Sequence, residues 1–208
     1  MRHYPKEAFE TSSARQSKVA LVWMTSAIII TIGMANEFAG YERMPFLDLA
    51  GFQYSLPALY EALLLAWISV VILRSALSKS RTKRMILGIT FATMAVDKVV
   101  NAHALILEPI RHEGAFGANI ATGIPIVFAI GLAAFSRPII TSNWGCKAIA
   151  LGAYGFVFLF AATVIDPMPG FADLEEIGEI VGATGLLATL LAPTVFGFHH
   201  KGFQSPEP

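Results

Sequence analysis

Residues 56–77 read LPALYEALLLAWISVVILRSAL, an apolar run that contains one carboxylate, Glu61, and one basic residue near its end, Arg74. A helix rises about 1.5 Å per residue, so a run of this length crosses the roughly 30 Å hydrocarbon core of a bilayer. The segment 62–66, ALLLA, does not alternate polar and apolar residues as a membrane β-strand would. Because no water reaches the bilayer core, the backbone must satisfy its own hydrogen bonds. The stretch therefore predicts a transmembrane helix and an all-α membrane fold.

The composition supports the same class of protein for the whole chain. Of the 208 residues, 55% are hydrophobic and 14% are charged, and the mean hydropathy is +0.60. Soluble domains carry about 25% charged residues, so a soluble enzyme and a disordered chain are excluded, and a net charge of zero speaks against a nucleic-acid partner. A lone cysteine, Cys146, excludes a disulfide framework and a multi-cysteine zinc site. Five further apolar stretches are expected to be membrane helices: 19–38, 85–106, 120–135, 147–165 and 174–196.

The sequence thus predicts a single domain over residues 1–208, a bundle of six transmembrane helices with short tails at 1–18 and 197–208. All Lys and Arg residues except Arg43, Lys98 and Arg111 fall on one side of these six spans. Basic residues in short loops of membrane proteins stay on the cytoplasmic side. We therefore expect the protein to lie in the inner membrane with both termini in the cytoplasm. The lipid bilayer is the expected partner, with other membrane subunits or further copies of the chain as additional candidates.

The acidic residues show the opposite distribution, since all except Glu7, Glu10 and Glu207 fall on the outer half. Acids at the start of a helix are favoured by the helix dipole, which explains part of this asymmetry. It does not explain Asp97, which lies deep in the third span. An ionisable group at that depth costs roughly 2.5–3.5 kcal/mol on insertion scales and marks a site that faces the bundle interior.

Two helix faces collect these acids. On a continuous helix at about 100° per residue, Asn101 lies roughly 40° from Asp97 and Glu108 roughly 20°. On the last helix, Glu175 and Glu179 are one turn apart. Like charges so placed repel one another, so a cation, a shared proton or a basic side chain has to compensate. Few basic residues are at that level, namely Lys98, Arg43 and Arg111.

These residues predict a polar layer just below the outer surface. Asp97, His103, Glu108, Glu175, Glu176 and Glu179 are the candidate metal ligands, and Glu37, Glu61, Asn101 and Asp166 are expected to complete the pocket. Carboxylates from facing helices suit a divalent metal, and a histidine shifts the preference toward iron, zinc or manganese. Within this layer, Asp97 and Glu179 are expected to act on one site. The alternative is an internal hydrogen-bond network in which Lys98 pairs with one of the acids.

One stretch carries a resemblance. Residues 95–103, AVDKVVNAH, followed by LEP at 107–109, resemble an Asp-Glu-x-x-x-x-His-Glu helix of small bacterial six-helix membrane proteins. A late helix of that family opens Glu-Glu-x-x-Glu before a glycine-rich run, which corresponds to LEEIGEIVGA at 174–183. The chain departs from this pattern at Lys98 and Ala104, and the similarity extends loosely from the third to the sixth span. No activity is established for that family, so the resemblance implies a constellation of Asp97, His103 and the late glutamates without a reaction.

Three functions are compatible with this pattern. The first is an outward-facing acidic and histidine-containing pocket that binds a divalent cation or a small polar ligand, with or without catalysis. The second is a non-catalytic integral subunit of a larger membrane complex, and the third is a proton- or cation-coupled transporter. The chain contains neither G-x-S-x-G nor H-E-x-x-H, so nothing supports a membrane serine protease or zinc protease.

Overall fold

A computed structural model describes residues 6–39, 44–49, 54–75, 81–141 and 172–191. Most of these residues are helical and none of them forms a strand, which confirms the expected all-α class for the part of the chain described. The elements follow in the order α1 (Lys6–Phe38), the short 3-10 helix η2 (Pro45–Leu47), α2 (Leu56–Ser75), α3 (Arg81–Val100), α4 (Ala102–Arg111), α5 (Ala115–Thr141) and α7 (Ala172–Leu191).

Two of the described helices are long and apolar enough to cross a membrane, over Ser17–Phe38 and Leu56–Arg74. A third span results if the bent pair Thr82–Val100 and Leu105–Arg111 is counted as one. Helix α5 contains the fourth expected stretch, 120–135, and α7 contains the described part of the sixth. The fifth stretch, 147–165, lies outside the described residues. The chain is therefore compatible with a membrane protein, and the count of six spans stays a prediction.

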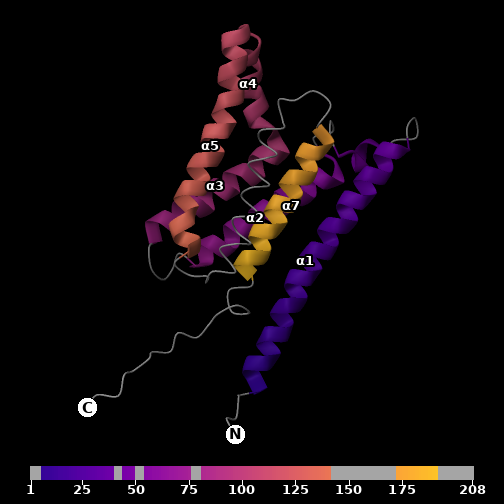
Figure 1. Ribbon diagram of the computed structural model, residues 1–208, viewed down its shortest axis with the longest axis vertical. Helices are drawn as coiled ribbons and strands as arrows, with labels where there is room; N and C mark the ends of the chain where they lie inside the picture. The colour runs from indigo at the N-terminus through magenta and orange to yellow at the C-terminus, as the bar shows by residue number, and fades with distance from the viewer. Residues whose placement is uncertain (1–5, 40–43, 50–53, 76–80, 142–171, 192–208) are drawn as a thin grey trace.

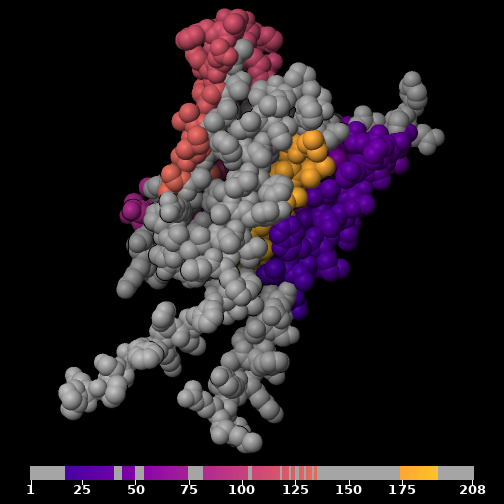
Figure 2. Space-filling model, viewed as in Figure 1, coloured from indigo at the N-terminus to yellow at the C-terminus, as the bar shows by residue number. Residues whose placement is uncertain are grey.

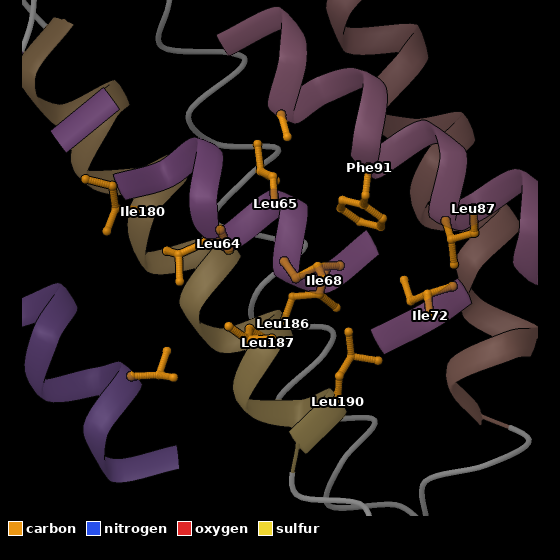
Figure 3. Close-up of a cluster of buried hydrophobic side chains, with 13 residues drawn as sticks. Leu64, Leu65, Ile68, Ile72, Leu87, Phe91, Ile180, Leu186, Leu187 and Leu190 are labelled. Atoms are coloured by element: carbon orange, nitrogen blue, oxygen red, sulfur yellow. The ribbon is translucent and has the colours of Figure 1, made fainter. Parts of the chain in front are cut away.

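Helix α2 lies at the centre of the described bundle. It packs along α3 and α7, and α7 in turn packs along α1 (Figure 1). Their shared core is aliphatic apart from one aromatic ring, and Figure 3 shows its side chains pointing toward one another from α2, α3 and α7. Ile68, Phe91 and Leu187 are completely buried there. Helix α4 packs against α5, and in Figure 1 these two helices extend away from α1.

The outer faces of the helices carry large apolar side chains. On α1, Leu21, Met24 and Ile28 are more than half exposed, whereas Val22 and Ile29 face the core. The part of α1 from residue 17 to 38 forms one flank of the molecule in Figure 2. A helix that is apolar both toward its neighbours and toward the outside is typical of a membrane span, because lipid replaces water around it.

Hydroxyl groups connect the helices inside this apolar core. Ser26 Oγ of α1 lies 2.8 Å from the Tyr60 hydroxyl of α2 and 2.6 Å from Thr184 Oγ1 of α7. Between α2 and α3, Ser69 Oγ donates a hydrogen bond to the carbonyl oxygen of Gly88 at 2.7 Å. Gly88 is also a close-approach position, since a Cβ atom there would lie 2.6 Å from the side chain of Leu73. Such contacts between helices use small and hydroxyl-bearing residues, as is common in membrane bundles.

The helix expected over 85–106 is not continuous. Asn101 has φ 56° and ψ 39°, the left-handed conformation, and separates α3 from α4. The axes on its two sides differ by 71°. Asn adopts this conformation more readily than most residues because its short polar side chain can hydrogen-bond locally. The prediction of one helix is therefore wrong at this point, and the shared face deduced for Asp97 and Glu108 no longer follows.

Candidate cation site

Three helix ends meet at one end of the described bundle. Helices α2 and α7 contribute their N-terminal halves, with Glu61 on α2 and Glu176 and Glu179 on α7. Helix α3 contributes its last turn, which carries Lys98. Because α3 runs antiparallel to α2 in the bundle and its end meets the starts of α2 and α7, residues far apart in sequence come into contact. We call Glu61, Glu176 and Glu179 the acidic triad.

The ammonium group of Lys98 lies between the three carboxylates. Its Nζ atom is 2.7 Å from Glu61 Oε2 and 2.8 Å from Glu176 Oε2, and it also donates a hydrogen bond to Glu179 Oε2. The side chain of Glu61 is 3% exposed, whereas those of Lys98 and Glu179 are 20% and 22% exposed. The site is thus closed on the side of α2 and partly open beside Lys98 and Glu179.

The charges at this site do not balance. If all three carboxylates are ionised, one ammonium leaves two negative charges without a partner among the described residues of the cluster. Uncompensated charge in a low-dielectric interior is costly, so protons or a further cation have to supply the difference.

Hydrogen bonding at the site is also incomplete. Glu61 Oε2 and Glu176 Oε1 are buried and accept no hydrogen bond from any residue in the described part of the chain. Glu61 Oε2 is nonetheless partnered, since Lys98 Nζ lies 2.7 Å from it in an ion pair. Buried polar atoms in folded proteins nearly always have a partner, so Glu176 Oε1 indicates that Lys98 does not fully satisfy the cluster.

The acidic triad has the dimensions of a metal site. One carboxylate oxygen of each residue lies within 4.8 Å of the others, and the group could hold a metal ion. A set of ligands made of carboxylates suits the hard cations Mg²⁺, Ca²⁺ and Mn²⁺.

The structure brings some of the expected ligands together and separates others. Glu176 and Glu179 are in the triad, and Glu61, expected as a pocket residue, supplies the third carboxylate. Asp97 is half-buried directly before Lys98 but lies outside the triad, so its action with Glu179 on one site stays a prediction. Glu108 is exposed on α4, where its carboxylate lies 3.6 Å from Arg111 and 3.2 Å from His112. These two contacts are within its own helical turn and do not involve the triad.

The remaining expected residues lie elsewhere or outside the description. Glu175 is half-buried on α7, Glu37 is half-buried near the end of α1, and Asn101 is half-buried at the bend, all outside the triad. His103 belongs to α4 by its backbone, but its side chain is not among those described. Asp166 lies outside the described residues.

Sequence reasoning named Lys98 as a compensating charge and did not identify it as the centre of the site. The available signal was its position, a lysine in the last turn of an apolar helix at the level of many acids. Helical spacing alone could not show that α2 and α7 point their acids at this lysine, because that depends on how the helices pack.

Comparisons of the chain with protein-family models, with curated proteins and with solved structures find no match. The function of this chain therefore has to be inferred from the residues of its own site.

Proposed function

We propose that this chain is an integral inner-membrane protein, with both termini in the cytoplasm, whose acidic triad binds a divalent cation near the outer surface. The observation that carries the proposal is the convergence of three carboxylates from two helices on one point, which a positively charged group already occupies. A point that holds an ammonium group among three carboxylates is also suited to a metal ion.

The chemistry of the ligands favours a hard divalent ion. Carboxylate oxygens bind Mg²⁺, Ca²⁺ and Mn²⁺, whereas iron and zinc sites more often include nitrogen or sulfur ligands. The described ligands of the triad are all carboxylates, and the expected nitrogen ligand, His103, is not among the described side chains. Mn²⁺ belongs to the class favoured by carboxylates and to the class that histidine would favour, and it is therefore the appropriate probe.

A second function is supported by the contacts of Lys98. Since this lysine pairs with all three acids, the cluster could be a structural ion-pair network in a non-catalytic subunit of a larger membrane complex. In that case the triad would hold α2, α3 and α7 together and would have no affinity for a metal ion.

Binding of Mn²⁺ to the purified protein in detergent, measured by electron paramagnetic resonance, separates the two functions. We expect the unaltered protein to bind one Mn²⁺ ion and Glu179→Gln to weaken binding by about tenfold or more, since each carboxylate ligand contributes charge to the site. Glu113→Gln is the matched control, because Glu113 is exposed beyond α4. If the unaltered protein binds no Mn²⁺, or if both variants bind equally, the structural network is the better description.

A further inference from the structure

The contacts of Lys98 lead to an inference that rests on the proposed cation site. We propose that Lys98 is a built-in competitor for that site: its ammonium group holds the place of the ion, is displaced when a divalent cation binds, and so sets the affinity of the acidic triad for cations.

The ammonium and the ion would occupy the same place. Lys98 Nζ contacts one carboxylate oxygen from each member of the triad, at 2.7 Å from Glu61 and 2.8 Å from Glu176. An ion bound by these three residues would lie about 2.0–2.6 Å from the same oxygens. It would then be in contact with the ammonium, which steric overlap and like charge both forbid. Binding of the ion and the inward position of Lys98 are therefore mutually exclusive.

The ammonium does not fully balance the charge and the hydrogen bonding of the three carboxylates. It pairs with one oxygen of each carboxylate, including Glu61 Oε2 at 2.7 Å. Glu176 Oε1 is buried without a hydrogen-bond partner among the described residues, and the ammonium carries one positive charge against three carboxylates. A divalent ion brings a further charge and can bind oxygens from more directions than the three N–H groups of an ammonium. A divalent ion therefore suits the arrangement of the acids better than the lysine does.

The side chain of Lys98 is able to turn away from the acidic triad. A lysine ammonium sits on a flexible stem of four carbons, and this side chain is 20% exposed, so one side of it is not enclosed. It belongs to the last turn of α3, just before the bend at Asn101. Its side chain can therefore turn away from the triad without breaking the interior of a helix.

This competition has a consequence for selectivity. A monovalent cation that displaces the ammonium replaces one unit charge by another and improves the charge balance of the site very little. A divalent cation adds one further positive charge against three carboxylates. Because the same ammonium has to leave before either ion binds, Lys98 lowers the affinity of the acidic triad for both, and the divalent ion is the one whose charge can compensate that loss.

The first test compares Mn²⁺ binding in three forms of the full chain: unaltered, Lys98→Gln and Lys83→Gln. Lys83 is exposed near the start of the same helix, so its variant makes the same charge change away from the site. We expect Lys98→Gln to bind Mn²⁺ about tenfold more tightly or better, since a nearby positive charge has been removed, and Lys83→Gln to be unchanged. If the unaltered protein binds Mn²⁺ and Lys98→Gln binds it no more tightly, the competition is refuted while the cation site stands. If neither form binds Mn²⁺, it is the cation site itself that fails.

The second test uses the unaltered protein and is independent of how well any variant folds. Reductive methylation of lysine amines is followed by mass spectrometry with and without Mn²⁺, at a concentration at which paramagnetic resonance shows the ion bound. We expect the modification of Lys98 to rise severalfold with Mn²⁺ and that of Lys83 to stay constant. Bound Mn²⁺ together with constant or reduced modification of Lys98 would show that the ammonium is not displaced and would overturn the proposal.

Discussion

Replacing Lys98 by glutamine is expected to destabilise the protein far more than replacing any one of its carboxylate partners. The variant leaves three clustered carboxylates without their shared counter-charge. Glu179→Gln, by contrast, leaves the ammonium between two carboxylates. The two changes are of similar size and remove one charge each, so the difference between them isolates the charge balance of the acidic triad.

The magnitude follows from the distances. At an effective dielectric constant of about 20, opposite charges 2.8 Å apart attract by about 6 kcal/mol. Like charges 4.8 Å apart, the upper limit within the triad, repel by about 3.5 kcal/mol. Glu179→Gln loses one attraction and relieves two repulsions, which nearly cancel, so we expect a change within about 1 kcal/mol. Lys98→Gln loses three attractions and relieves no repulsion; after relaxation and proton uptake, the loss should be about 3–5 kcal/mol, as for other buried pairs broken on one side.

The assay is unfolding in mixed micelles with increasing sodium dodecyl sulfate, followed by tryptophan fluorescence, which reports on Trp23 in α1 and Trp67 in α2. Lys83→Gln is the control and should unfold as the unaltered protein does. The reasoning is refuted if Lys98→Gln loses no more free energy of unfolding than Glu179→Gln. That result would mean that water or another charged group compensates the triad and that Lys98 is dispensable.

Three further predictions concern the bundle around the site. Ser26→Ala removes two hydroxyl contacts between helices and should cost about 1–2 kcal/mol in the same unfolding assay; a loss below about 0.3 kcal/mol would contradict a role for these contacts. Gly88→Ala places a Cβ atom 2.6 Å from a leucine side chain of α2 and should cost about 1–3 kcal/mol, whereas Gly131→Ala meets nothing within 4 Å and should be neutral or stabilising. An alkaline phosphatase fusion at Glu113 should be active and one at Lys83 inactive, because the basic loops are expected in the cytoplasm; the reverse pattern would invert the proposed topology.

Much of the fold could be predicted because hydrophobic length is a strong signal. The apolar run at 56–77 appears as α2 from Leu56 to Ser75, and the stretch at 19–38 forms the last part of α1. The start of α1 at Lys6 was not predicted, since the polar residues before 19 carry no apolar signal although their backbone is helical. Helix propensity acts on such residues whether or not a membrane surrounds them.

The bend after α3 shows a different limit. Asn101 has no glycine or proline beside it, and the apolar residues continue on both sides of it, so the sequence offers no clear reason to end the helix there. Helix α4 packs against α5 beyond this residue, and such tertiary contacts can override the local preference of a single residue. Because of the bend at Asn101, Glu108 does not share a helix face with Asp97, which changes the expected set of ligands.

The acidic site could be predicted in part, because the sequence shows which residues are acidic but does not show which of them meet in space. Glu61, Glu176 and Glu179 stood out as acids near the ends of apolar helices. Which of ten candidate residues meet depends on the rotation of α2 against α7 about their axes, and this rotation is fixed by the buried side chains of the core, such as Leu65 and Leu187.

The backbone contributes to the charge balance of this site as well as to its geometry. The N-terminal turns of α2 and α7 carry partial positive charge, and the C-terminal turn of α3 carries partial negative charge. Lys98 lies in the last turn of α3, where a positive charge is favoured, whereas Glu61 and Glu179 lie beyond the first turns of α2 and α7, where the dipole effect has largely fallen off. The helix dipoles therefore favour the inward position of Lys98 more than they stabilise the carboxylates. An ion that displaces Lys98 would have to offset this interaction as well as the contacts with the three carboxylates, so removal of the ammonium should raise the affinity for Mn²⁺.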